Sequence, residues 1–217
     1  MTVLKQVPKP WERLFRHALR LLDDLQDKSG TVPFWTFGGG TALMLRYRHR
    51  MSKDVDIFVP DTQYLGYVTP RLSDVAEGIT RNYVEAAGYV KLVLPDGEID
   101  FVAAPNLTDD PFEELALLGR MVRVETAAEI IAKKMWHRGD QVAARDLFDL
   151  ALVIRREPAS LTKAGAFLMK HREPFLAQLE SRKAILRESF DAIDTLDFDP
   201  TFDECVKRVN RFLIGLK

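Results

Sequence analysis

The sequence predicts an α/β (α+β) fold, in which a small mixed sheet flanked by helices is followed by a C-terminal helical bundle. Short apolar runs typical of strands alternate with helical patterns over the first 125 residues, whereas residues 160–217 contain only helical patterns. Hydrophobic residues make up 47% of the 217-residue chain and charged residues 29%, which is enough apolar material for a core and excludes a disordered chain. The predicted domains are therefore an α/β core over residues 1–125 and a helical region over residues 126–217, packed on the core.

The first part of the core is predicted from a change of periodicity along the chain. Apolar residues recur every three or four positions over residues 11–28, which predicts an amphipathic helix, and Pro10 suits the start of that helix. An aromatic run over residues 34–37 predicts a first strand, and residues 41–48 predict a short helix. The alternation of residues 55–59 predicts a central strand with its apolar side chains on one face.

The second part of the core is predicted to begin with a helix and to continue with strands. Pro70 favours a helix start, so residues 71–87 are predicted to be helical, closed by Gly88. The turn sequence Pro95-Asp96-Gly97 predicts a hairpin. The remaining predicted elements are strands over residues 89–94, 98–104 and 121–124 and helices over residues 126–136 and 145–156.

A glycine turn followed by two carboxylates is the feature around which the chain is organised. Asp54 and Asp56 are two positions apart on the predicted central strand, so their side chains are expected to share one face. Two adjacent anions repel unless a cation lies between them, and Mg²⁺, which prefers oxygen ligands, suits such a pair. The turn Gly38-Gly39-Gly40 before Thr41 exposes backbone N–H groups at a helix start, where a phosphate is stabilised. Together these features predict binding of a nucleoside triphosphate and transfer of one of its phosphoryl groups.

The order of these two motifs carries a family resemblance. A small-residue turn followed by D-x-D resembles the opening motif of the polymerase-β-like nucleotidyltransferases. Within that superfamily, the string GGTALMLRYRHRMSKDVDIF resembles the AbiEii/AbiGii toxin family, in which a GGTAL segment runs into H-R-x-S-x-D-[IV]-D. The resemblance covers residues 34–155. It implies use of NTP and magnesium, with two ions possible. For some relatives it implies nucleotide transfer to tRNA, and it implies pairing with a cognate antitoxin protein.

A third carboxylate is expected to complete a second metal site or to accept a proton from the attacking hydroxyl. Asp100, on the strand after the predicted hairpin, is the first candidate, and the resemblance implies a lone acidic residue on such a strand. Glu98 shares its face and remains an alternative, and both acids also fit a solvent-facing strand.

A basic helix and an acidic helix follow the sheet. The resemblance implies a helix carrying a lysine that contacts the triphosphate, here Lys134 rather than Lys133, followed by an R-D-[LIV]-[FY]-D-L helix. Asp146 and Asp149 share one helix face, and Asp146 is predicted to orient Lys134 or Arg145 or to act as a base. The structural alternative is a pair of surface charges worth roughly 0.2–0.5 kcal/mol.

The loop before the D-x-D motif holds further candidates. Arg50 is predicted to meet phosphate, and Ser52 to accept or donate a hydrogen bond beside the metal, although both also suit a simple loop. The basic cluster of residues 46–50, with Lys53, is a candidate patch for triphosphate or RNA.

Composition excludes several other classes. A net charge of −1 provides no global basic field, so specific DNA binding is not expected. One cysteine, Cys205, excludes an internal disulfide and a cysteine-based zinc cage and fits a cytoplasmic protein. Residues 1–10 read as a loose arm with no signal peptide, and no stretch is apolar enough for a membrane span.

The sequence therefore predicts a magnesium-dependent nucleotidyltransferase that transfers NMP from NTP to a tRNA-like RNA acceptor. Its site is predicted as Asp54, Asp56 and Asp100 for metal, residues 38–41 with Arg50, Ser52 and Lys134 for the triphosphate, and Asp146 as an additional catalytic residue. Two alternatives stay open: an NTP-dependent protein nucleotidyl- or phosphotransferase, and a non-catalytic NTP-binding module on the same fold.

Overall fold

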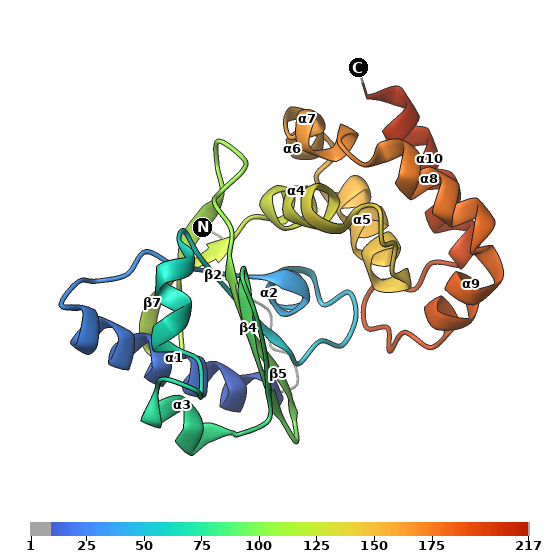
Figure 1. Ribbon diagram of the computed structural model, residues 1–217. Coiled ribbons are helices and arrows are strands. Elements are labelled where there is room, and N and C mark those ends of the chain that lie inside the picture. Colours follow the sequence, from blue (N-terminus) through green and yellow to red (C-terminus); the bar gives the residue numbers. More distant parts are fainter. Residues whose placement is uncertain (1–9, 217) are drawn as a thin grey trace. The chain divides into compact units, whose positions relative to one another are not determined.

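The structure is a computed structural model that describes residues 10–216 (Figure 1). The arm predicted for residues 1–10 lies outside this range except for Pro10. The chain divides into two compact units. The first comprises the described residues up to Arg46 together with Ser52–Asn106 and Phe112–Glu125, and the second comprises Tyr47–Met51, Leu107–Pro111 and the described residues from Thr126 onward. The domain boundary predicted at residue 125 stays a prediction. No helix in residues 10–216 is both long and apolar enough to cross a membrane.

The first unit is built on a mixed sheet. Over residues 10–216, seven strands form one sheet in the order β3-β4-β5-β2-β1-β7-β6. β2 pairs parallel with β5 and antiparallel with β1, and β1 pairs parallel with β7. The strands are β1 (Thr36–Gly38), β2 (Val55–Val59), β3 (Tyr83–Ala86), β4 (Tyr89–Leu94), β5 (Gly97–Ala103), β6 (Phe112–Leu117) and β7 (Arg120–Glu125). This sheet confirms the predicted α/β class.

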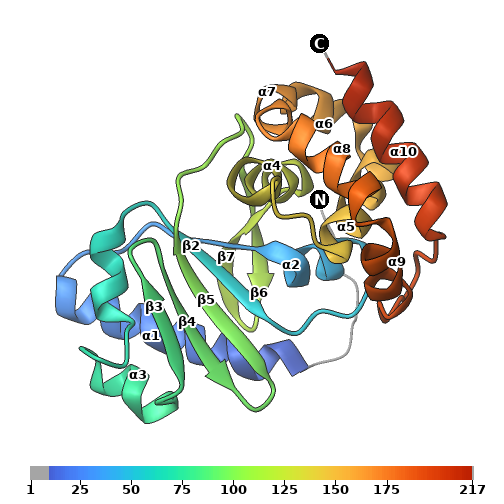
Figure 2. The ribbon, with the colours of Figure 1, turned by 45° about the vertical axis from the view of Figure 1, so that its right-hand side comes forward.

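The amphipathic helix α1 (Pro10–Ser29) packs against β2 and β5 and crosses one face of the sheet (Figure 2). Its apolar stripe is buried, and the ring of Phe15 contacts the ring of Phe37 of β1 in a tilted arrangement, with centroids 4.7 Å apart. On β2 the side chains of Val55, Ile57 and Val59 are buried, while Asp56 lies on the opposite face. The apolar face of the sheet thus packs into the core, and the opposite face carries Asp56 of the candidate site.

The predicted helix over residues 71–87 is wrong. A short helix, α3 (Asp74–Ile79), ends at Thr80, and the segment that follows forms the edge strand β3. Tyr83 and Val84 favour a strand, and β3 pairs antiparallel with β4 through a tight turn at Ala87-Gly88. Gly88 is therefore a hairpin residue and does not close a helix.

The strand β6 was not predicted. It pairs antiparallel with β7 through a turn at Leu118-Gly119, where both residues have positive φ. Its alternation is weak because Glu113 and Glu114 are adjacent. Between β2 and α3 the chain forms a 3₁₀ helix, η1 (Thr62–Tyr67).

The helix α2 (Gly39–Tyr47) begins in the first unit, and the second unit is helical (Figures 1 and 2). Its central helix, α5 (Ala144–Arg156), is buried along most of its length and packs against α4, α6, α9 and α10. Phe148 of α5 contacts Phe198 and Phe190, with ring centroids 5.1 and 5.5 Å apart. The other helices are α4 (Ala127–Arg138), α6 (Pro158–Lys163), α7 (Gly165–Met169), α8 (Arg172–Ser181), α9 (Lys183–Asp191) and α10 (Phe202–Gly215). The predicted helical C-terminal region is confirmed.

Candidate active site

Two carboxylates face each other across adjacent strands of the first unit. Asp56 of β2 and Asp100 of β5 are direct partners in the parallel register, and both side chains are half-buried. The Oδ1 atom of Asp100 is buried and has no hydrogen-bond partner within the described residues. Burial, followed by repulsion from the Asp56 carboxylate, raises the pKa of Asp100 to about 7. Both effects would be relieved by a cation between the two carboxylates.

The alternative third carboxylate, Glu98, has a partner of its own. Lys91 of β4 reaches the Glu98 carboxylate with Nζ 2.5 Å from Oε2, and the same Nζ is 3.6 Å from Oδ2 of Asp100. Glu98 is therefore held in an ion pair at the strand edge, whereas Asp100 keeps one carboxylate oxygen unused. This geometry favours Asp100 over Glu98 as the third carboxylate.

Asp54 lies directly before β2 and contacts the turn between β4 and β5. Its Oδ1 accepts a hydrogen bond from the backbone N–H of Glu98 at 3.1 Å. Gly97 of this turn has φ +152°, and a Cβ there would lie 2.9 Å from the same Asp54 oxygen. The glycine is thus required for the close approach of the Asp54 carboxylate.

The glycine turn lies against Asp56. Gly39 has φ +69°, and a Cβ at this residue would lie 1.8 Å from Oδ2 of Asp56. A Cβ at Gly38 would lie 2.1 Å from Oε2 of Glu125, a fully buried acid at the end of β7. Two of the three glycines therefore make room for carboxylates, a role that the phosphate-binding prediction for this turn did not include.

The start of α2 offers backbone donors beside this carboxylate. Gly39, Gly40 and Thr41 are the first three residues of the helix, so their N–H groups have no carbonyl partner within it. The predicted phosphate contact fits these backbone groups but does not fit the Thr41 side chain. The Thr41 hydroxyl is buried and donates to the backbone carbonyl of Asp54 at 2.5 Å, with the Ser52 hydroxyl 3.0 Å away. Thr41 and Ser52 thus hold the loop that carries Asp54.

Part of the predicted basic patch has a structural role. The guanidinium of Arg46 donates to the backbone carbonyls of Glu125 and Val124 at 2.9 and 3.0 Å and to Oε2 of Glu113 at 2.6 Å. These bonds fix α2 to the β6–β7 hairpin. Arg46 is therefore not available to a triphosphate or to RNA.

A second cluster of predicted residues lies in the second unit, around Asp149. The Asp149 carboxylate is fully buried and accepts two hydrogen bonds from Arg50, at 2.7 Å from Nε and 2.8 Å from Nη2. It also contacts Nζ of Lys134 at 2.5 Å and Nε2 of His49 at 2.8 Å. Burial raises the pKa of Asp149, but the charges of Arg50 and Lys134 outweigh burial and hold it well below its usual value. The predicted phosphate contact by Arg50 does not fit this buried pairing.

Asp146 lies at the same cluster, one helical turn away. Its Oδ1 is 2.9 Å from Nζ of Lys134 and 2.8 Å from Nη2 of Arg138. Burial raises the pKa of Asp146, but the charges of Lys134 and Arg138 outweigh burial, so the pKa lies below its usual value. The prediction that Asp146 orients Lys134 therefore matches the geometry, and the alternative of a solvated surface pair does not. Asp149 makes the shorter contact with the lysine.

The predicted site residues thus fall into two clusters. The first unit holds the glycine turn with Asp54, Asp56 and Asp100, and the second unit holds Lys134 with Asp146. No group of three or more histidine, cysteine or acidic side chains in residues 10–216 is arranged closely enough to hold a metal ion. The pair of Asp56 and Asp100 still fits a cation, because one buried oxygen of Asp100 is unpaired and its pKa is raised.

The family described as "Nucleotidyl transferase AbiEii toxin, Type IV TA system" matches residues 20–211. The chain belongs to this family. The AbiEii resemblance that the glycine turn and D-x-D motif carried is thereby confirmed, and the chain is a nucleotidyltransferase of a toxin–antitoxin family. A search of the curated proteins gave no match.

Three solved structures resemble this chain over most of its length. A putative nucleotidyltransferase from H. pylori has a TM-score of 0.53 at 16% identity, covering 97% of each chain. The nucleotidyltransferase toxin MenT4 from Mycobacterium tuberculosis has a TM-score of 0.52 at 19% identity, covering 94% of this chain and 84% of its own. JHP933 from Helicobacter pylori has a TM-score of 0.51 at 18% identity, covering 98% and 95%. These likenesses support the nucleotidyltransferase fold.

Proposed function

We propose that this AbiEii-family protein transfers a nucleoside monophosphate from NTP to an RNA acceptor of the tRNA kind in a magnesium-dependent reaction. The observation that carries the proposal is the close approach of the glycine turn to Asp56, opposite Asp100. The unpaired oxygen and raised pKa of Asp100 are the features expected where a cation completes the site. The carboxylates of Asp56 and Asp100 therefore suit a divalent metal, with Asp54 beside them. When bound, such a metal neutralises charge on the phosphates.

The residues of this chain would contribute binding, orientation and proton transfer. The N–H groups at the start of α2 would hold phosphate oxygens of the NTP. The acceptor hydroxyl would attack the α-phosphorus, forming the new P–O bond as the bond to pyrophosphate breaks. Asp100 has an alternative role in place of metal binding: with a pKa near neutrality in the metal-free protein, its carboxylate would be suited to accept the hydroxyl proton, whereas a metal bound to it would lower this pKa.

The family motif and two ion pairs bring Lys134 into the proposal. The carboxylates of Asp146 and Asp149 contact its ammonium group and orient it. We propose that this lysine contacts the triphosphate. Kinetics of Lys134→Met test this role, since a triphosphate contact predicts a raised KM for NTP with tRNA binding unchanged.

The type IV toxin–antitoxin description of the family leads us to propose a cognate antitoxin as the biological partner. The single buried cysteine, Cys205, leads us to propose a reducing cytoplasm as the place of action. Growth arrest on overexpression, rescued by co-expression of a neighbouring gene, is the expected outcome for the antitoxin. Arrest that persists in Asp56→Asn would contradict the link between toxicity and nucleotidyl transfer.

The decisive experiment supplies α-labelled or γ-labelled NTP, magnesium and total RNA to the purified chain. Label from the α position should appear in RNA and disappear in Asp56→Asn, with Glu98→Gln as the matched control that keeps transfer. Label that appears only from the γ position would indicate phosphotransfer, and label in protein would indicate protein nucleotidylation. Tight NTP binding without any transfer would favour a non-catalytic NTP-binding module.

A further inference from the structure

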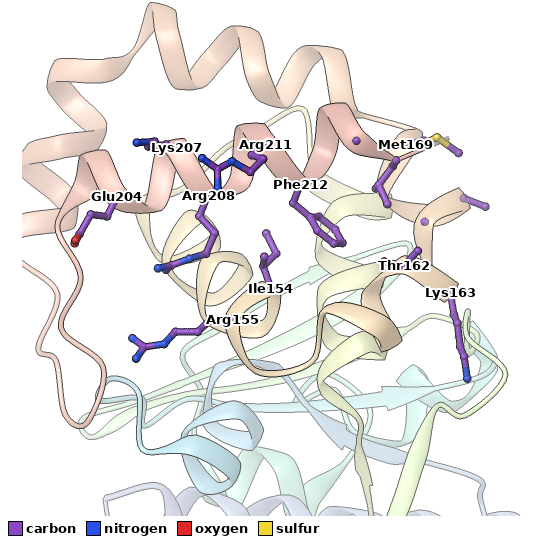
Figure 3. A pocket seen from close by; sticks show the side chains of 14 residues that line it. Ile154, Arg155, Thr162, Lys163, Met169, Glu204, Lys207, Arg208, Arg211 and Phe212 are labelled. Atoms are coloured by element: carbon purple, nitrogen blue, oxygen red, sulfur yellow. The ribbon is translucent and has the colours of Figure 1, made fainter.

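A basic cleft lies within the second unit, between α5, α6, α7 and α10. It has a volume of about 1050 Å³. Figure 3 shows the side chains that line it, with Arg155, Arg208 and Arg211 on one side and Phe212 and Met169 toward the other. The volume is at the upper limit of clefts that hold a single small molecule. A larger ligand with an extended shape fits it better.

The charge of this cleft is one-sided. Of the described residues that line it, five are basic and one, Glu204, is acidic. The basic residues are Arg155, Lys163, Lys207, Arg208 and Arg211. The Glu204 carboxylate is engaged in capping α10, since it accepts from the backbone N–H of Thr201 at 2.8 Å and from its hydroxyl at 3.0 Å. The carboxylate offsets part of the positive charge beside Arg208 and Arg155, but one acid against five basic side chains leaves the lining net positive, so the cleft attracts anions.

Few protein groups partner the basic side chains of the cleft, although the guanidinium of Arg155 lies over the Phe198 ring at 5.7 Å from its centroid. Within residues 10–216, none of the five forms an ion pair, and Nη1 of Arg208 is buried with no hydrogen-bond partner. A buried guanidinium N–H without an acceptor is costly, and a bound anion would satisfy it. Charges on neighbouring basic residues of one helix face also repel one another, and a bound polyanion would relieve this repulsion.

The geometry of α10 suits a chain of phosphates rather than one phosphate. Lys207 and Arg211 are four residues apart on this helix, which places them about 6 Å apart along its axis. The half-buried ring of Phe212 lies on the same helix beside them and offers an aromatic face. Basic groups that follow a backbone next to an aromatic ring are the features by which proteins hold single-stranded RNA.

We propose that this cleft binds a single-stranded segment of RNA, with its phosphates on the basic residues of α10 and α5 and a base against Phe212. This inference rests on the proposed function, which names RNA as the acceptor. It adds the surface that would bind that acceptor. An acidic polypeptide would also meet positive charge here, and competition with poly-glutamate distinguishes it from RNA.

The test is fluorescence anisotropy of a fluorescein-labelled, unstructured oligoribonucleotide titrated with the full chain without NTP or magnesium. The test variant is Lys207→Gln with Arg211→Gln, because both side chains are exposed and glutamine suits a helix. We expect about tenfold weaker binding. The negative slope of log K against log salt should become shallower by about 1.4, since two phosphate contacts with a single strand are lost. Arg208→Gln and Phe212→Leu should each weaken binding, and Phe212→Leu should leave the salt slope unchanged.

The matched control is Arg172→Gln with Lys183→Gln, which removes the same charge from helices α8 and α9 outside the cleft. Equal weakening by the test and control pairs, or no weakening by the test pair, would overturn the proposal. So would displacement of the RNA by poly-glutamate at equal charge. Binding needs no turnover, so an inactive chain whose RNA affinity depends on Lys207 and Arg211 would refute the proposed function and keep this inference.

Discussion

Asp56 and Asp100 are direct register partners on the parallel strands β2 and β5, and the repulsion between them adds to burial in raising the pKa of Asp100 to about 7. The ordinary value for this group is 3.8. Ionisation of Asp100 therefore lowers the stability of the folded protein. The pH dependence of the melting temperature measures this loss without any substrate.

The first prediction concerns Asp100→Asn and pH. Because the pKa of Asp100 is higher in the folded protein than in the unfolded chain, the folded state binds more protons between these values. Stability should therefore fall as pH rises from about 4 to about 7, with the full loss present above about 7. Asp100→Asn should raise the melting temperature at about pH 8 and have little effect near pH 4. A melting temperature of Asp100→Asn below that of the wild type at alkaline pH would contradict the pKa assignment.

The second prediction concerns magnesium. A cation between Asp56 and Asp100 should favour their ionised forms, so added magnesium should stabilise the protein more at about pH 8 than at about pH 5. Differential scanning fluorimetry measures the shift, with potassium chloride of equal ionic strength as the reference. The shift should be lost in Asp56→Asn. An equal shift in Asp56→Asn would show that magnesium binds elsewhere.

The third prediction concerns Gly39→Ala. Gly39 and Gly30 have the same φ of +69°, but a Cβ at Gly39 would clash with Asp56, whereas a Cβ at Gly30 meets nothing within 4 Å in the described part of the chain. Both variants carry the backbone cost of roughly 1–2 kcal/mol for a left-handed conformation. Gly39→Ala should lose clearly more stability in urea unfolding, and it should also lose nucleotidyl transfer. Equal losses in the two variants would show that Asp56 does not constrain this turn.

The fourth prediction compares Asp149→Asn with Asp146→Asn. Removing the Asp149 charge takes from the buried Arg50 the carboxylate that accepts two of its hydrogen bonds and leaves Lys134 paired with Asp146 alone, which should cost about 3–5 kcal/mol. Asp146→Asn should cost less, because Arg138 is half-exposed and Asp149 still pairs with Lys134. The folded pKa of each acid is depressed, so the stabilisation is present above the unfolded pKa and is lost as pH falls through the folded value. A larger loss in Asp146→Asn would reverse the assigned order.

The fifth prediction concerns Cys205. This thiol is fully buried, and burial raises its pKa to about 12, so the thiolate is scarce in the folded protein. Its reaction with a thiol reagent should therefore be slow in buffer and should accelerate with the same urea midpoint as global unfolding. Rapid labelling without denaturant would show that α10 opens locally.

Much of the fold was predictable because its signals are local. The stripe of α1, the alternation of β2 and the turn at Pro95-Asp96-Gly97 each depend on a few neighbouring residues, and all were correct. The helix predicted over residues 71–87 failed because its second half pairs with β4, and pairing between strands is not visible in a local pattern. β6 was missed for the same reason, since only its partner β7 gives it a place in the sheet.

The sequence by itself determined the family, the α/β class and the two motifs, because a glycine turn and a D-x-D pair are short and keep their spacing. Only the tertiary structure decided which groups meet: that Gly39 makes room for Asp56, that Asp100 keeps an unpaired oxygen while Glu98 pairs with Lys91, and that Arg50 is buried against Asp149. The physical reason is that charge pairing and burial depend on residues far apart in the chain. A pattern along the chain shows which groups are present, and the packing of the chain determines the charge and the partner of each.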